Sequence, residues 1–441
     1  MVSCIDDESK LGNKAVSTLS FADTLEAVYS SERYTIFELT VPEVSQKNQE
    51  KPLSYEWQVN YKVESTSKDL KFECKDCGEF PCRLKISNED GAIFREFTLK
   101  VPYPYEKGLV VLSRYDGRSM LSFRSEDDGA KFVKDVYRLN NESVDLGNDP
   151  KGLFYNDYYK CIYIATEEPV KVVKVEHNTM SVLNVLKYPE ARVDKIFKQG
   201  SFDVCFMGGG RIVDMSCGNE SFNNNFQQQL TGSSGVVGMY PGAVLANSLL
   251  SMSDWNVRFT IVYDTYHKLL LKYASSSITE ICEEINGLTF IEMLLCRSKT
   301  DALIMVKNDL GEVSVVHHNV DENKLISNES AASAGMTDQS VFMLSQKEDI
   351  LFYTNGNKIF RYNYISEGNF PTSPDYTVGE EGDVIKEMVL DPKEQKLYVA
   401  VDASTGDYRG GVYCYDNETK QLLWKETGVA GEIVQMIYKE K

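Results

Sequence analysis

The chain has 441 residues, of which 42% are hydrophobic and 26% charged, and its formal net charge is −19. This length suits two to four domains, and the apolar content is high enough to exclude a disordered or collagen-like chain. The acidity argues against nucleic acid as a partner, because phosphate binding requires a basic surface.

The N-terminus carries a short motif of the lipoprotein type. Val2-Ser3-Cys4 has the form of the last residues of a bacterial lipoprotein signal, with Cys4 as the residue that carries the lipid and Met1 in place of the apolar segment. The acidic run Ile5-Asp6-Asp7-Glu8 resembles the export signal of Bacteroidetes surface lipoproteins. The alternative is a buried or frayed cysteine in a cytosolic protein. Residues 1–20 are polar and suit a flexible tether.

Residues 21–103 predict a small antiparallel sandwich. In Tyr55-Glu56-Trp57-Gln58-Val59, the strand period places Tyr55, Trp57 and Val59 on one face, as expected for a core strand with a buried tryptophan. Residues 80–88 and 94–101 predict a closing hairpin across the Asp90-Gly91 turn. This combination resembles an immunoglobulin-like domain of the polycystic-kidney-disease (PKD) type. The stiff segment 102–105, with two prolines, predicts a domain boundary.

Cys74, Cys77 and Cys82 form the one closely spaced group among ten cysteines. We expect them to be structural thiols, and a local disulfide or a metal site are the alternatives. Structural zinc takes four ligands, and no fourth cysteine or histidine lies nearby in the sequence, so we expect no stoichiometric zinc there. The four histidines stand in no recognisable metal or hydrolase motif, and we expect no cofactor.

Residues 106–441 predict a β-propeller. Strand-like units recur at a spacing of roughly 30–47 residues, the length of a four-stranded blade. The last unit is the clearest, with strands in Lys396–Val401, Gly411–Asp416 and Thr419–Trp424. At about 45 residues per blade, the segment holds seven or eight blades. The best helix candidate, Ser277–Ile285, is short, so the whole chain is predicted to be all-β; a β-helix or paired sandwiches are the alternatives to the propeller.

The order of these parts resembles a known family. A lipoprotein-like Cys4, a PKD-like domain, and Gly108–Ser113 followed by Asp116-Gly117-x-Ser119 are similar to the PKD-like family lipoproteins of Bacteroidetes. The resemblance implies a protein anchored by lipid in the outer membrane and displayed at the cell surface. It also implies that a SusC/SusD-like TonB-dependent importer and other surface lipoproteins are its partners. Cys4 is the only residue to which the family gives a role.

The function predicted from these features is binding without catalysis. Sialidase-type boxes and the Gly-x-Ser-x-Gly motif are missing, although 66 acidic residues leave a two-carboxylate, polysaccharide-processing enzyme open. A structural transporter subunit that touches no ligand is a further alternative. We expect the chain to bind or hand over an oligomeric nutrient, with peptide slightly favoured over oligosaccharide. The candidate binding residues, in loop-like aromatic clusters, are Tyr155, Tyr158, Tyr159, Tyr240, Trp255 and Asn256. The alternative is that these rings pack between blades.

The run Ser221–Ser253 contains 33 residues without a charge. It is interpreted either as a flexible insertion between blades or as a surface that meets an uncharged ligand or partner. The second interpretation follows from the desolvation cost that charged groups incur at an interface.

Overall fold

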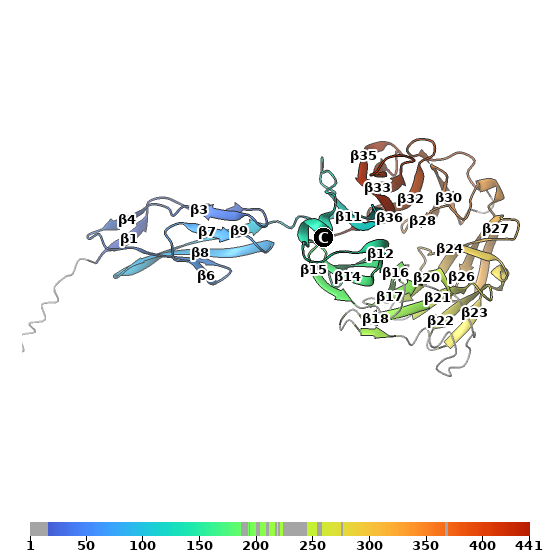
Figure 1. Ribbon diagram of the computed structural model, residues 1–441, viewed down its shortest axis with the longest axis horizontal. Coiled ribbons are helices and arrows are strands. Elements are labelled where there is room, and N and C mark those ends of the chain that lie inside the picture. The colour runs from blue at the N-terminus through green and yellow to red at the C-terminus, as the bar shows by residue number, and fades with distance from the viewer. Residues whose placement is uncertain are drawn as a thin grey trace, which may run out of the picture. The chain divides into compact units, whose positions relative to one another are not determined.

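A computed structural model describes residues 16–186, 193, 195–199, 203–208, 211–216, 218, 221–223, 245–253, 258–274, 277–366 and 369–441. The chain is all-β, as predicted, and divides into two compact units, Met1–Pro104 and Tyr105–Lys441 (Figure 1). Within the described ranges the helical elements are α1 (Val136–Asn140), η1 (Glu283–Ile285) and η2 (Ala332–Ala334). None of them is long and apolar enough to cross a membrane.

The first unit contains three sheets. Their strands are β1 (Thr18–Phe21), β2 (Val28–Ser30), β3 (Ile36–Leu39), β4 (Val44–Lys47), β5 (Ser54–Val59), β6 (Lys62–Ser65), β7 (Leu70–Glu73), β8 (Gly78–Asn88) and β9 (Gly91–Val101). In the described residues the largest sheet has the order β2-β9-β8-β5-β6, and β1 pairs with β4 and β3 with β7. Trp57 is fully buried, and its indole N–H donates to the carbonyl oxygens of Ser67 and Lys68, both at 3.2 Å.

The first unit begins earlier than the sequence indicates. Residues 18–20, which we assigned to the tether, belong to β1, where Leu19 is buried. Just before β1, Ser17 donates its backbone N–H to the Asp90 carboxylate at 2.8 Å. The alternating burial of β1 against β4 was hidden in the sequence by its serine and threonine content.

The second unit is built of antiparallel sheets. Its strands are β10 (Gly108–Tyr115), β11 (Arg118–Ser125), β12 (Asn148–Asn156), β13 (Cys161–Glu168), β14 (Val170–Glu176), β15 (Val182–Leu186), β16 (Lys195–Gln199), β17 (Asp203–Gly208), β18 (Arg211–Ser216), β19 (Ser221–Asn223), β20 (Leu245–Ser253), β21 (Arg258–Asp264), β22 (Leu269–Ala274), β23 (Ser277–Ile281), β24 (Thr289–Leu295), β25 (Asp301–Lys307), β26 (Val313–Asn319), β27 (Lys324–Ser330), β28 (Phe342–Leu344), β29 (Ile350–Asn355), β30 (Lys358–Asn363), β31 (Tyr376–Thr377), β32 (Val384–Leu390), β33 (Lys396–Asp402), β34 (Gly410–Asp416), β35 (Leu422–Ala430) and β36 (Glu432–Lys439).

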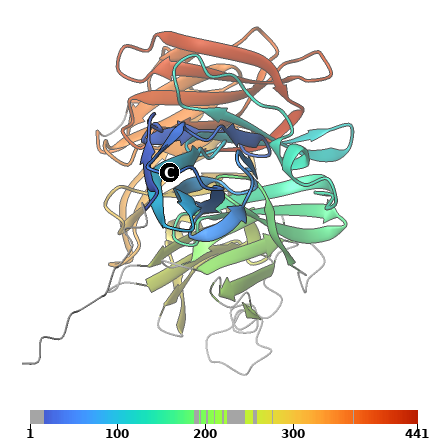
Figure 2. The same ribbon diagram turned by 90° about the vertical axis from the view of Figure 1, so that its left-hand side faces the viewer.

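These sheets are arranged around a centre, which is the architecture of a β-propeller (Figure 1, Figure 2). Over the described residues, four-stranded sheets follow in chain order as β16–β19, β20–β23, β24–β27, β28–β31 and β32–β35. The first strand of each sheet contacts the first strand of the next, and β36 contacts both β32 and β12. The ring is closed by β36, which pairs with β10 from Gly108↔Lys439 to Arg114↔Glu432. Strands more than 300 residues apart in sequence therefore share one sheet.

A β-bulge recurs near the start of the innermost strands. The pairing register shifts at Lys151 in β12, Ile291 in β24, Lys386 in β32 and Val434 in β36. A bulge bends a strand and re-aims the side chain that follows it. The residues after three of these bulges are Glu292, Glu387 and Gln435, so the repeat places polar side chains at one level of the inner strands.

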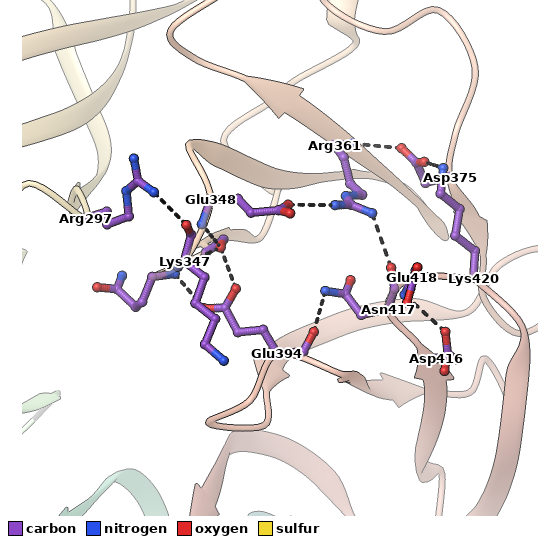
Figure 3. Close-up of polar contacts among 12 residues, drawn as sticks. Arg297, Lys347, Glu348, Arg361, Asp375, Glu394, Asp416, Asn417, Glu418 and Lys420 are labelled. Atoms are coloured by element: carbon purple, nitrogen blue, oxygen red, sulfur yellow. Dashed lines mark hydrogen bonds and ion pairs between the residues drawn. The ribbon is translucent and has the colours of Figure 1, made fainter.

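Turns of successive sheets are hydrogen-bonded to one another (Figure 3). From the β24–β25 turn, Arg297 donates to the Lys347 carbonyl oxygen at 2.7 Å and pairs with Asp349 at 2.9 Å. From the β32–β33 turn, Glu394 accepts the Ser345 hydroxyl at 2.5 Å and the Gln346 backbone N–H at 2.7 Å. The charged groups here are satisfied within the protein, which indicates a structural role in joining consecutive sheets.

Candidate functional site

A pocket of about 440 Å³ lies beside the β10–β11 turn. The loop before β12, which contains α1, and the β33–β34 loop form its other walls. The side chains on which its chemistry depends are Tyr115, Arg118, Ser119, Tyr137, Arg138 and Tyr408. It lies at the end of the propeller where β12 and β36 begin, since Arg114 of β10 pairs there with Asp149 and, at 3.6 Å, with Glu432.

A tight turn places the first tyrosine of the pocket. Asp116 and Gly117 have φ values of 49° and 76°, which is the pattern of a two-residue Asp-Gly hairpin turn. This turn presents Tyr115, whose ring stacks on Tyr408 with centroids 4.0 Å apart and planes 17° from parallel. Lys134 lies over the Tyr408 ring at 4.6 Å. The stacked pair offers a flat, pre-formed aromatic surface to a ligand.

Two buried hydroxyl groups in this pocket lack partners. Ser119 is 8% exposed and Tyr137 is 2% exposed, and neither hydroxyl has a hydrogen bond to any described residue. Burial raises the pKa of Tyr137 to about 12, so its hydroxyl is a proton donor at neutral pH. A buried hydroxyl without a partner costs roughly 1–3 kcal/mol, a cost that a ligand's polar atoms would remove.

The loop that carries Tyr137 is held in place from within the second unit. Asn141 donates to the carbonyl oxygens of Tyr137 at 2.8 Å and Met180 at 2.7 Å, and accepts from the backbone N–H of Val182 at 2.8 Å. Asn140 donates to the Tyr105 hydroxyl at 3.0 Å. The pocket is therefore pre-organised on this side, which reduces the entropy lost on binding.

Charges of both signs surround the pocket. Arg118 and Arg138 face a lining that also contains Asp135, Glu142 and Asp145. Burial raises the pKa of the Asp135 carboxyl above its ordinary value. A mixed lining of this kind suits a ligand that carries both charges or many amide groups better than a uniformly charged one.

The ring of inner strands contains a carboxyl group with an unusual pKa. Burial raises the pKa of Glu387 to about 7, and the Met388 backbone N–H and Lys195 oppose the rise only in part. Glu292 lies in the same electrostatic environment and accepts Lys195 Nζ at 3.5 Å. Glu387 is thus an inner-strand carboxyl group that changes charge near neutral pH.

Replacing Glu387 by glutamine should stabilise the protein only at high pH. The folded state holds the Glu387 proton more tightly than the unfolded chain, so its contribution to stability is complete below about pH 4.5 and is lost as the pH rises through 7. Glu387→Gln is neutral throughout. The variant should melt at the same temperature as wild type at pH 4.5 and about 5–10 °C higher at pH 8, because a pKa raised from 4.5 to about 7 is equivalent to roughly 3 kcal/mol of stability. Equal differences at both pH values in scanning calorimetry would contradict this.

The predicted tyrosines lie elsewhere in the second unit. Tyr158 and Tyr159 meet edge to face at 4.9 Å in the turn between β12 and β13, where they are 60% and 36% exposed. Tyr155 is half-buried, stacks on His177 at 5.6 Å and donates to the Glu440 carbonyl oxygen at 3.4 Å. It lines a shallow pocket at the end where β12 and β36 finish. The structure thus brings these three residues together, but away from the Tyr115 pocket.

The other predicted binding and lipidation sites fall outside the described residues. They are Cys4, Tyr240, Trp255 and Asn256. The uncharged run Ser221–Ser253 is described only at its ends, where residues 221–223 form β19 and residues 245–253 form β20. The run is therefore not a single loop, because it includes an innermost strand of the propeller.

Sequence reasoning missed Tyr115, Ser119, Tyr137 and Tyr408. The Asp116-Gly117 turn was a usable signal for Tyr115, because a tight hairpin turn exposes the side chains that flank it. No local pattern connects Tyr115 to Tyr408, which is almost 300 residues away and meets it only when the ring closes.

The cysteines of the first unit belong to its core. Cys74 and Cys82 are buried thiols that form no disulfide, and the half-buried Cys77 packs against the same core. Burial raises the pKa of Cys82 to about 11, so the thiol is protonated at neutral pH. Neutral, buried thiols behave as small apolar side chains.

Comparisons with known proteins bear on the fold. No protein-family model and no curated protein matches the sequence. A quinonprotein alcohol dehydrogenase-like protein from Bacteroides thetaiotaomicron is similar in structure over 96% of this chain and 99% of its own, at 16% identity and a TM-score of 0.57. A Lactobacillus plantarum protein matches 76% of this chain and 100% of its own at 12% identity, with a TM-score of 0.54. A functionally unknown protein from Desulfotomaculum acetoxidans matches 76% and 99% at 11% identity, with a TM-score of 0.51.

These similarities show a shared fold and leave the activity open. The Bacteroides protein spans nearly the whole of both chains, so the first unit as well as the second has a counterpart in it. Identities of 11–16% carry no information about ligands.

Proposed function

We propose that this chain is a ligand-binding propeller that captures an oligomeric nutrient in the Tyr115 pocket. The observation that carries the proposal is the pair of buried, unpartnered hydroxyls of Ser119 and Tyr137 beside the stacked rings of Tyr115 and Tyr408. Rings supply contact area at low entropic cost, and the hydroxyls select polar ligand atoms. The mixed charges of the pocket favour peptide over oligosaccharide.

The wider assignment rests on the architecture and on the N-terminal motif. In this proposal the first unit is an immunoglobulin-like domain of the PKD type. The second unit is a seven-bladed propeller, and its first blade is formed by β36, β10 and β11. The chain is a lipoprotein of the outer membrane, anchored through Cys4 at the cell surface. It serves as accessory subunit of a SusC/SusD-like importer, together with other surface lipoproteins. The closed series of contacts among seven inner strands supports the blade count; these strands are β36, β12, β16, β20, β24, β28 and β32.

Binding at the pocket is tested by Tyr408→Ala. We expect the wild-type chain to bind members of a panel of defined tri- to hexapeptides in calorimetric titration, and Tyr408→Ala to weaken that binding at least tenfold, about 1.4 kcal/mol. Tyr158→Ala, which removes an exposed ring from the opposite end of the inner strands, is the control and should bind as wild type. A panel of oligosaccharides run in parallel decides the ligand class. Equal weakening by both variants, or by neither, would remove the pocket from consideration.

The anchor is tested separately. Full-length protein expressed behind a lipoprotein signal should incorporate labelled palmitate, and Cys4→Ala should release it in soluble form. Protease added to whole cells should digest the wild-type protein. Protection in intact cells would refute surface display while leaving the pocket result unaffected.

A second candidate function is polysaccharide cleavage. Glu387, with its pKa near 7, has the property of a general acid, and Glu292 is a second carboxylate in its environment. If the protein cleaves polysaccharides, incubation with a panel of polysaccharides should generate new reducing ends. The Glu387→Gln variant should generate none. Recovery of every bound oligomer intact by mass spectrometry would exclude it.

A further inference from the structure

Three side chains with metal-binding atoms meet at the junction of two sheets. Cys282 and Glu284 lie in the connection that follows β23, and His318 lies in β26 of the next sheet (Figure 1). The thiol sulfur, a carboxylate oxygen and a ring nitrogen all lie within 4.8 Å of one another. Cys282 and His318 are each 1% exposed, whereas Glu284 is exposed, so the cluster opens to solvent on one side.

The hydrogen bonds of Asn323 fix the tautomer of His318. Asn323 Oδ1 accepts the backbone N–H of Cys282 at 3.2 Å, which identifies that atom as the amide oxygen. The same oxygen lies 3.1 Å from His318 Nε2, so Nε2 is the donor and carries the proton. In a neutral imidazole the lone pair then resides on Nδ1. Nδ1 is buried and has no hydrogen-bond partner among the described residues.

This arrangement matches that of a metal-bound histidine. Histidine ligands typically donate their second ring N–H to an oxygen acceptor, which sets the tautomer and orients the ring. The neighbouring His317 points to other groups, Asp301 at 3.6 Å and the Tyr364 ring at 5.3 Å, and takes no part.

We propose that Cys282, Glu284 and His318 bind a zinc ion, with a fourth coordination position left to water. Thiolate and imidazole select zinc over magnesium or calcium, and the charges of thiolate and carboxylate balance the divalent ion. Tetrahedral zinc bonds of about 2.0–2.3 Å place ligand atoms roughly 3.3–3.8 Å apart. The three ligand atoms already lie within 4.8 Å of one another, so side-chain movements of about 1 Å reach this geometry.

The binding step releases one proton and involves no oxidation. Cys282 is a free, buried thiol, and zinc binds the deprotonated form of a cysteine. Zinc replaces that proton at sulfur, and the proton passes to solvent. The bound ion then connects the β23–β24 segment to β26 and so fixes two adjacent sheets against each other.

The site is tested by zinc titration of the full chain after removal of metal with a chelator. We expect one zinc per chain, and cobalt in its place should give a thiolate-to-cobalt charge-transfer band in the near ultraviolet. Glu284→Gln, an exposed change that leaves folding intact, should weaken zinc binding at least 10-fold. Cys282→Ala should weaken it on the order of 100-fold and remove the cobalt band.

Two controls separate this site from the other cysteines. Cys296 has the same 1% exposure as Cys282, and Cys77 belongs to the three-cysteine segment of the first unit. Cys296→Ala and Cys77→Ser should both retain zinc. A wild-type chain that binds no zinc, or affinity unchanged in both Glu284→Gln and Cys282→Ala, overturns the proposal. Loss of zinc in Cys77→Ser alone would assign the metal to the first unit instead.

Discussion

Replacing Gly431 by alanine should strongly destabilise the closure of the second unit. Gly431 lies between β35 and β36, and a methyl group on it would collide with the Arg114 carbonyl oxygen and lie 2.9 Å from Tyr115 Cβ. Both obstacles belong to β10, the strand to which β36 must pair. Overpacking usually costs about 1–3 kcal/mol and occasionally more. We expect the variant to lose about 3 kcal/mol of unfolding free energy, because the colliding oxygen belongs to the backbone and cannot rotate away.

The matched control is Gly356→Ala. Gly356 has φ of 60° but open space around its Cα, so alanine there meets conformational strain and no collision. That change should cost only ~1 kcal/mol. Urea denaturation of both variants separates the two effects. If Gly431→Ala loses no more stability than Gly356→Ala, the closure of the ring tolerates a larger gap than the structure indicates.

Replacing Trp57 by alanine should unfold the first unit selectively. The side chain is fully buried, meets Phe97 edge to face at 6.4 Å, and satisfies two carbonyl oxygens. Truncating a buried tryptophan to alanine lowers the free energy of unfolding by roughly 3–5 kcal/mol. The total free energy of unfolding of a domain of this size is about 5–15 kcal/mol. Calorimetry of the full chain should show an early transition for the first unit and an unchanged one for the second.

Tyr61→Ala provides the comparison within the same hairpin. Tyr61 lies in the turn between β5 and β6 and is 82% exposed, so its removal should change the free energy of unfolding by no more than about 0.5 kcal/mol. A Trp57 variant that melts as late as the Tyr61 variant would show that the core repacks around the lost indole.

The sequence predicts the local structure of this protein well. Alternation in Tyr55–Val59 correctly indicated a core strand, and the Asp90-Gly91 turn correctly indicated a hairpin, because both depend on neighbouring residues only. The segment Ser277–Ile285, our best helix candidate, is instead β23 followed by a 3₁₀ turn. Its β-branched residues satisfy strand pairing with β22, and pairing outweighs a weak helical pattern. The five-residue α1 gave no signal, since so short a helix depends on tertiary contacts.

The candidate site was largely hidden for a different reason. Tyr115 ends β10, whereas Tyr408 lies in the loop between β33 and β34 of another sheet. Cys282 follows β23, and His318 lies in β26 of the next sheet. Their proximity follows from ring closure and from the packing of sheet on sheet, which no window of sequence contains. Local aromatic content indicated Tyr155, Tyr158 and Tyr159, which are close together in the chain. It gave no sign of Tyr115 and Tyr408, whose rings meet only after folding.

The pairing of β10 with β36 also has a consequence for biosynthesis. Ribosomes add about 5–20 residues per second, so the roughly 300 residues between the two strands take about 15–60 s to make. Throughout this interval β10, which is buried along most of its length in the finished protein, has no partner along one edge. An unpaired apolar edge is a template for aggregation. We therefore expect the nascent chain to expose this edge until β36 emerges, and to become resistant to protease late and in a single step.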